Sequence, residues 1–374
     1  MAVARISHAR LCSLRAMLAG LAAALGPVAC AQPAPLSVTF LDTAPISATS
    51  TLDQHGQSVT ITGLSGIVWL GNSSLATIGP GGGPASNQND YLAILDNSNA
   101  LVRLRVQLNA EANAIESVAV LGAIRFDQSR DWEAIAAGPR AGHTLLAEEG
   151  TPSIAMLNPA TGQIAWTAAA PPPFQNRRPN RGFESLTTDP HRGIAWTANE
   201  EALTTDGPAA SPSTGTVVRL LRWNVTPIGA TPGPQHAYLV DRMPGATIPG
   251  GSSGLSELLL LDDGRLLALE RSLSLTSGLF RNKLYEVGLD TATNVASIPA
   301  LTAAPFVPAS KRLLWEGSVQ NLEGLCQGPR LRDGRTLLIG VVDDGDPVSV
   351  NTVVALSLRG QGPRPGPTVR AASD

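Results

Sequence analysis

The chain has 374 residues, and its 27 basic and 30 acidic side chains give a formal net charge of −3, which argues against the strongly basic surface that nucleic-acid binding needs. Charged residues make up only 15% of the chain, against about 25% on average. The 37 glycines and 29 prolines favour many turns and short strands over long helices. A hydrophobic share of 43% is enough for a sizeable core and excludes wholesale disorder.

The N-terminus has the pattern of an export signal. Basic residues between Arg5 and Arg15 precede an apolar stretch, residues 17–28, which ends at a cleavage pattern, residues 29–31. The stretch is shorter than the roughly 20 residues of a membrane-spanning helix, so we expect a signal peptide over residues 1–31, no transmembrane segment, and a periplasmic or extracellular protein. A lipid anchor on Cys30 is the alternative. After cleavage Cys326 is the remaining cysteine, which leaves no internal disulfide.

Short apolar runs bounded by Gly, Pro, Asn or Asp recur after the signal, as is typical of short β-strands. They contain a two-part unit that returns about every 50 to 70 residues. The first part places a small or acidic residue at the start of an apolar strand, in five windows: residues 63–67 (GLSGI), 131–135 (DWEAI), 182–186 (GFESL), 254–258 (GLSEL) and 321–325 (NLEGL).

The second part follows a turn and ends an apolar strand with acidic residues. Four windows have this form: residues 145–149 (LLAEE), 196–201 (WTANEE), 266–270 (LLALE) and 338–344 (LIGVVDD). Each unit is therefore predicted to be an antiparallel hairpin whose first and last residues lie at the same end. The hairpins predict four close acidic pairs: Glu133 with Glu148, Glu184 with Glu201, Glu257 with Glu270, and Glu323 with Asp344.

Multi-stranded units repeated at this spacing are typical of a β-propeller. We predict an all-β chain with a single β-propeller of five to six blades over residues 36–360. A sixth blade is expected if residues 36–62 join the last strands, near residues 352–358, because propellers often close by pairing both ends of the chain. The tail, residues 361–374, is rich in Pro, Arg and Gly and is predicted to be disordered. We expect a monomer.

The same windows resemble the phytase-like family of secreted bacterial proteins, described as having esterase-like activity of phytase. The matching signatures are D-x-E-x-I at 131–135, A-E-E at 147–149, N-R-G-F-E-S-L at 180–186, L-S-E-L at 255–258, L-L-A-L-E-R at 266–271 and L-E-G-L at 322–325. The resemblance runs over residues 64–344 and implies a β-propeller fold and a calcium-dependent phosphoesterase. The chain departs from the pattern in its first unit, where Ser65 and Gly66 stand without an acid.

Carboxylates crowded at a propeller mouth are tolerated when a hard cation neutralises them, and Ca²⁺ takes about six to eight oxygen ligands in a flexible cage. The candidate calcium ligands are the paired acids: Glu133, Glu148, Glu184, Glu201, Glu257, Glu270, Glu323 and Asp344. The competing interpretation is that these side chains accept hydrogen bonds from backbone amides and hold adjacent blades together. The two roles are compatible for different members of the set.

Phosphoester cleavage also needs positive charge near the attacking and departing oxygens. Arg181 and Arg271 adjoin the acidic windows, and Lys283 is a third candidate; for each, the alternative is a structural salt bridge. We therefore predict a hydrolase, a calcium-dependent phosphoesterase acting on small phosphorylated substrates such as phytate. The alternatives are a non-catalytic binding or scaffold propeller of the cell envelope and a lactonase-like carboxyl-ester hydrolase.

Overall fold

The computed structural model describes residues 34–71, 89–245, 251–274, 280–346 and 349–362. Within these ranges the chain forms β-strands and two short 3-10 helices, η3 (Pro172–Asn176) and η4 (Leu301–Ala303). No helix in this part of the chain is both long and apolar enough to cross a membrane. The predicted signal peptide, Cys30 and residues 363–374 of the predicted tail lie outside the described residues.

The strands form five four-stranded antiparallel sheets, which confirms the all-β propeller and sets the number of blades at five. Blade 1 contains β4 (Leu64–Trp69), β5 (Asp90–Leu95), β6 (Ala100–Leu108) and β7 (Ile115–Arg125). Blade 2 contains β8 (Trp132–Ala137), β9 (Thr144–Glu148), β10 (Ser153–Asn158) and β11 (Gln163–Ala169). Blade 3 contains β12 (Phe183–Asp189), β13 (Ile194–Asn199), β14 (Thr216–Thr226) and β15 (Gly229–Val240). Blade 4 contains β16 (Ser252–Leu260), β17 (Leu266–Leu273), β18 (Phe280–Gly288) and β19 (Ser310–Gly317).

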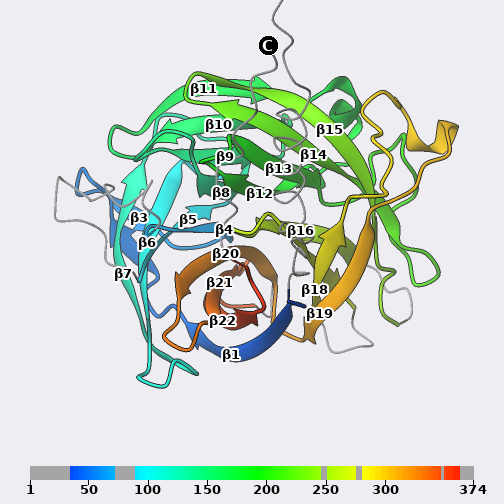
Figure 1. Ribbon diagram of the computed structural model, residues 1–374. Coiled ribbons are helices and arrows are strands. Elements are labelled where there is room, and N and C mark those ends of the chain that lie inside the picture. Colours follow the sequence, from blue (N-terminus) through cyan, green and yellow to red (C-terminus); the bar gives the residue numbers. More distant parts are fainter. Residues whose placement is uncertain (1–33, 72–88, 246–250, 275–279, 347–348, 363–374) are drawn as a thin grey trace, which may run out of the picture. The chain divides into compact units, whose positions relative to one another are not determined.

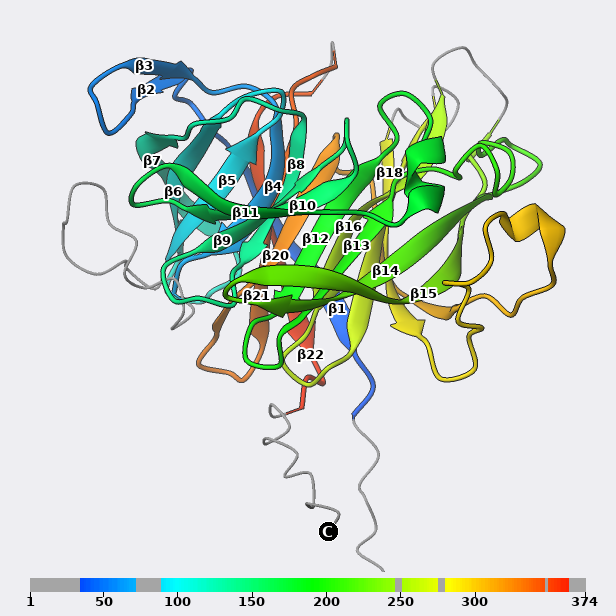
Figure 2. The ribbon, with the colours of Figure 1, turned by 90° about the horizontal axis from the view of Figure 1, so that it is seen from above.

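Blade 5 uses both ends of the described chain. It combines β20 (Leu322–Arg330), β21 (Thr336–Val342) and β22 (Thr352–Arg359) with β1 (Ser37–Pro45), in the order β1-β22-β21-β20. The predicted pairing of the two ends is thus confirmed, but it completes the fifth blade and no sixth blade forms within the described ranges. The remaining N-terminal strands, β2 (Ser50–Leu52) and β3 (Ser58–Thr60), form a separate hairpin beside β7 (Figure 2).

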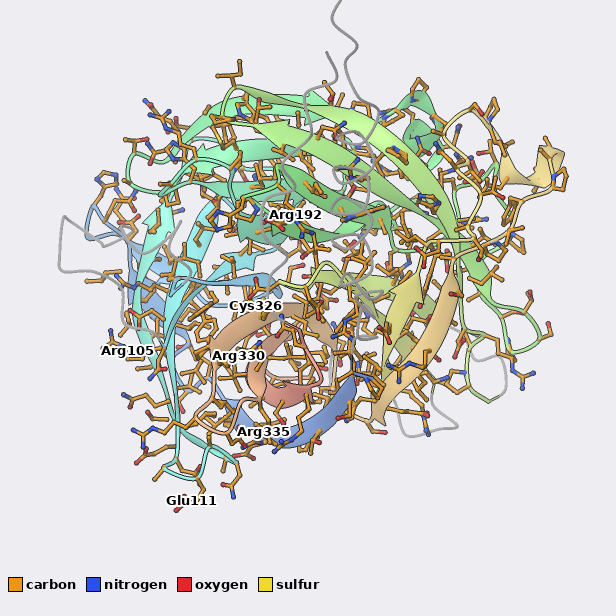
Figure 3. All side chains as sticks on the ribbon, viewed as in Figure 1. Arg105, Glu111, Arg192, Cys326, Arg330 and Arg335 are labelled. Atoms are coloured by element: carbon orange, nitrogen blue, oxygen red, sulfur yellow. The ribbon has the colours of Figure 1, made fainter. Side chains whose placement is uncertain are left out.

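The first strand of each blade lines the middle of the ring. Figure 1 shows these inner strands, β4, β8, β12, β16 and β20, around a common centre, and each contacts the next until β20 meets β4. Buried residues of adjacent blades pack together between the sheets, so the core is divided among the blade interfaces. Figure 3 illustrates how burial increases toward the centre: exposed Glu111 lies at the outer edge, whereas buried Cys326, a free thiol, lies close to the centre.

Two glycines allow the inner strands to approach closely. A Cβ atom on Gly66 would lie 2.9 Å from Ala134 Cα, and one on Gly324 would lie 2.8 Å from Gly66 Cα. Neither backbone has room to give way, because interiors are densely packed. These two glycines therefore let β20, β4 and β8 pack closely together. The residues at the start of these strands meet at one end of the ring of inner strands, which we call the mouth.

Candidate metal centre

Every inner strand has a β-bulge at the same position. The pairing with the second strand of each blade shifts by one residue, between Leu64 and Gly66 in β4 and at the equivalent place in the other four. A bulge re-aims the extra side chain. The extra residues, which we call the first ring, are Ser65, Glu133, Glu184, Ser256 and Glu323, and each is at most 9% exposed.

A second ring is formed by the residue that directly follows the second strand in four blades, and by Arg271, within β17, in blade 4. Its members are Asp96, Glu149, Glu200, Arg271 and Asp343. In four blades the backbone amide of this residue donates to the carbonyl oxygen two residues before the bulge, as from Glu149 to Asp131 at 2.9 Å; in blade 4, Arg271 pairs with Gly254. The same hydrogen-bond arrangement therefore presents the second ring beside the first.

Two groups of carboxylates converge within the rings. Asp96, Asp131 and Glu133 form one, and Glu149, Glu184 and Glu200 form the other; in each, one oxygen from every residue lies within 4.8 Å of the others. We call them the blade 1–2 group and the blade 2–3 group. Carboxylates this close repel one another unless protons or a cation neutralise them.

Burial and like charge raise the pKa values of these acids. Burial raises the pKa of Glu149 to about 7, with Asp131 and Glu200 adding to the effect and the amide of Gly182 opposing it. Burial also raises the pKa of Glu133 and of Glu184 well above the ordinary value for a glutamate, and neighbouring carboxylates add to both shifts. Without a cation, these carboxyl groups therefore favour binding protons.

These shifts predict how pH affects the stability of the metal-free protein. A glutamate with a raised pKa binds a proton in the folded state that it has released in the unfolded state, so the stability it contributes is lost as pH rises. For Glu149, the pH range over which this stability is lost runs from its pKa in the unfolded state, about 4.5, to its pKa in the folded state, about 7. In EGTA, the melting temperature should fall by roughly 5 °C or more between pH 5 and pH 8.

Calcium should flatten this curve, because a bound cation displaces the protons and its affinity rises with pH. The measurement is thermal unfolding at each pH with EGTA and with calcium. A melting temperature that rises from pH 5 to pH 8 in EGTA would contradict the protonated site.

Two arginines supply positive charge to the carboxylates of the rings. The Arg271 guanidinium donates to Glu323 and, at 2.8 Å, to Glu200. In blade 4, Arg271 therefore occupies the second-ring position that an acid holds in the other blades, and it supplies a positive charge there. Arg181 also donates to Glu200, at 2.6 Å. Burial raises the pKa of Glu323 to about 8 although Arg271 lowers it, because Asp343 and Glu200 add negative charge. The structure thus brings two of the three predicted cations, Arg181 and Arg271, to the site.

The second acid of each predicted pair lies outside the two groups. Adjacent residues of a strand point to opposite faces, and the ring positions fall one residue away from those predicted. Each of these acids has partners elsewhere. Glu148 accepts from Arg130 and Ser153, and Glu201 lies 3.6 Å from Arg178. Glu270 accepts from Tyr238 and Lys311, and Asp344 accepts from Thr62 and Asn351. Glu133 instead lies with Asp96 and Asp131, and Glu184 with Glu149 and Glu200.

Glu257 and Lys283 also lie apart from the groups. The Glu257 Oε1 atom accepts from the amides of Leu258 at 2.9 Å and of Leu186, in the next blade, at 3.1 Å. This is the blade-bracing arrangement that was the alternative to metal binding, while Ser256 takes the ring position. Lys283 donates to Asp241 at 2.6 Å.

Sequence reasoning missed Asp96 and Asp131. Asp96 directly follows β5, whose residues 91–95 form the same apolar run ending in an acid as the other units. The first unit therefore does contribute a carboxylate, from its second strand. Asp131 opens the window that contains Glu133, but the residue shared among the windows is the Glu, so the pattern singles out Glu133 alone.

The donor set fits a hard cation. All six members of the two groups offer carboxylate oxygen, the ligand that calcium prefers. The Oδ1 atom of Asp96 is buried and has no hydrogen-bond partner within the described ranges. A buried carboxylate oxygen without a donor is costly, so this atom suits coordination to a metal ion.

Five antiparallel blades around two rings of mostly acidic side chains define a β-propeller with a carboxylate-lined mouth. The family model described as "Phytase-like: Esterase-like activity of phytase" matches residues 61–345. The chain therefore belongs to the phytase-like family. No curated protein matches its sequence.

Several solved structures are similar to this chain at low identity. An endo-arabinase from Bacteroides thetaiotaomicron is 12% identical with a TM-score of 0.43, over 83% of this chain and 97% of that one. The calcium-binding protein regucalcin from Agrobacterium tumefaciens is 11% identical with a TM-score of 0.40, over 86% and 97%. Hydrazine synthase from Kuenenia stuttgartiensis is 10% identical with a TM-score of 0.36; the match covers 80% of this chain and only 63% of that one. None of these bears on the chemistry of the mouth.

Proposed function

We propose that this propeller is a calcium-dependent phosphoesterase that hydrolyses phosphomonoesters such as phytate. The observation that carries the proposal is the convergence of two carboxylate groups, each with its oxygens within 4.8 Å of one another, at a single mouth. Membership of the phytase-like family supports it. Acids that only brace the blades would not need to lie so close that their charges destabilise one another.

The residues of the mouth have distinct parts in this proposal. The blade 1–2 and blade 2–3 groups would hold calcium, which when bound polarises a phosphoryl oxygen and lowers the pKa of water. Arg181 is one-third exposed, and its Nε and Nη2 atoms have no partner within the described ranges, so they are free to meet a phosphate oxygen. Arg271, only 12% exposed, instead fixes Glu200 and Glu323 in place.

We further propose that the protein is exported and works as a monomer in the periplasm or outside the cell. The basic and apolar pattern of residues 1–31 supports export. Calcium-dependent activity suits that location, because extracellular modules bind calcium with dissociation constants of about 10⁻⁴ to 10⁻³ M.

A substrate panel tests the function. Purified protein is incubated with phytate, a generic phosphomonoester and a lactone, each with calcium and with EGTA. We expect calcium-dependent release of phosphate and no lactone opening. Calcium-dependent lactone opening alone would favour the carboxyl-ester hydrolase, and binding of calcium without turnover of any substrate would favour the non-catalytic propeller.

A further inference from the structure

A cavity opens at the end of the ring of inner strands opposite the mouth, and we call this end the far end. The cavity has a volume of about 150 Å³, and residues from all five inner strands line it. Each inner strand begins at the mouth, beside the two rings of the candidate metal centre, and runs toward the far end. The cavity is therefore separate from the carboxylates that are proposed to hold calcium.

Five side chains, one from each inner strand, form the inner wall of the cavity. Each lies three residues after the first-ring residue of its strand and is 5–7% exposed, whereas the residue directly before it is at most 2% exposed. None of the five has an aromatic ring or a long side chain. They therefore leave the centre of the ring unfilled, although protein interiors are otherwise densely packed. These wall residues are Val68, Ala136, Thr187, Leu259 and Cys326.

The wall residues are uncharged. Three of them are aliphatic, and Thr187 does not ionise. Burial raises the pKa of the Cys326 thiol well above its ordinary value, so this thiol stays protonated at neutral pH. A charged molecule would lose its hydration in the cavity without meeting an opposite charge on the wall. The wall therefore favours an uncharged molecule.

Two acids that also line the cavity disfavour anions in particular. Asp189 accepts from the amides of His191 and Arg192, and Asp262 accepts from the side chain of Gln327 at 3.0 Å. The Arg192 guanidinium lies 3.5 Å from Asp189 but does not line the cavity. No arginine or lysine of the described ranges lines it. The far end is thus unsuited to a phosphorylated substrate.

Thr187 brings a hydrogen-bond donor to the wall. Its Oγ1 atom accepts from the amide of Leu260 at 2.8 Å. The hydrogen of the same hydroxyl group has no acceptor within the described ranges, although Thr187 is only 6% exposed. The neighbouring Thr188 differs, because its hydroxyl group donates to the carbonyl of Ala137 at 2.7 Å. A buried donor without an acceptor is costly, so an acceptor on a bound molecule would stabilise Thr187.

We propose that the far-end cavity binds a small uncharged molecule with an apolar ring and one hydrogen-bond acceptor, of the chemical class of the phenols. The size is suitable, because an apolar cavity of about 150 Å³ holds a molecule such as benzene. The ring would supply the dispersion contacts that the hollow lacks, and the oxygen would accept from Thr187. This binding depends neither on calcium nor on the proposed hydrolysis.

Fluorine NMR titration with para-fluorophenol and fluorobenzene tests the site, because the two probes differ only by a hydroxyl group. Both should bind the wild type saturably and equally well with calcium and with EGTA, para-fluorophenol with a Kd below about 1 mM. Ala136→Leu places a larger side chain in the cavity and should weaken the binding of both probes by about tenfold or more. The matched control is Ala160→Leu, the same substitution at an exposed turn residue, which should leave both affinities unchanged.

Thr187→Val keeps the shape of the side chain and removes the donor, so it decides the question if Ala136→Leu does not fold. We expect it to weaken para-fluorophenol about fivefold and fluorobenzene less than about twofold. Equal weakening of both probes by Thr187→Val overturns the hydrogen bond to the ligand. No saturable binding to the wild type, unchanged affinities in the folded variants, or loss of binding in EGTA overturns the site itself.

Discussion

Replacing Glu184 by Gln is expected to lower phosphoester turnover at least about 100-fold at a calcium concentration that saturates the wild type. The substitution keeps the shape of the side chain but removes one carboxylate of the blade 2–3 group. Glu133→Gln should act similarly on the blade 1–2 group. In EGTA at pH 8, neither variant should melt below the wild type, because each loses a like-charge repulsion. The measurements are initial rates, calcium titration by calorimetry, and thermal unfolding.

Glu257→Gln is the matched control for these two variants. Glu257 is as deeply buried as the ring glutamates but accepts from the backbone amides of Leu186 and Leu258. The amide oxygen of Gln can still accept, so turnover should stay within about threefold of the wild type and stability should fall by about 1 kcal/mol. Equal losses of turnover in Glu184→Gln and Glu257→Gln would count against a localised metal centre.

Removing the internal cation should have the largest effect on stability. Arg271→Gln leaves Glu200 and Glu323 buried without the guanidinium that joins them across two blade boundaries. Breaking a buried ion pair on one side typically costs about 3–5 kcal/mol, and we expect a loss of that size in urea unfolding with EGTA. Calcium should recover part of it by supplying positive charge to the same carboxylates.

Arg281→Gln provides the comparison. Arg281 pairs with Glu316 at 2.8 Å, also within blade 4, but both side chains are more than one-third exposed. An exposed pair contributes about 0–1 kcal/mol, so this variant should unfold at nearly the wild-type urea concentration. Similar midpoints for the two variants would show that Arg271 is no more important than a surface arginine.

The sequence windows predicted most of the fold because each one begins an inner strand. Residues 131–135 and 182–186 align so that their third positions, Glu133 and Glu184, are both bulge residues. The same alignment gives Ser256, whereas the acidic residue type favours the neighbouring Glu257. A bulge shifts the strand by one residue, and that shift is not visible in a pattern of residue types.

The site was less predictable, because the acids occur as doublets. Glu148-Glu149 and Glu200-Glu201 each contain one ring residue and one residue of the opposite face, and composition does not distinguish them. The choice depends on the backbone bonds that end the hairpin, such as that from Glu200 to Gly182 at 2.8 Å. Asp96 was missed for a different reason: residues 70–89 separate β5 from β4, a much longer connection than in the other blades, so the two parts of the first unit are far apart in the sequence.

The shared fifth blade constrains when a working mouth can exist. Its β1 and β22 are paired from Ser37↔Arg359 to Pro45↔Thr352, so nearly the whole length of the polypeptide separates the partners. A newly made chain cannot close the circle until its last strand is available, and contacts of such long range form slowly. Calcium binding at the proposed site should therefore be the final event of maturation, and loss of either partner strand should abolish it.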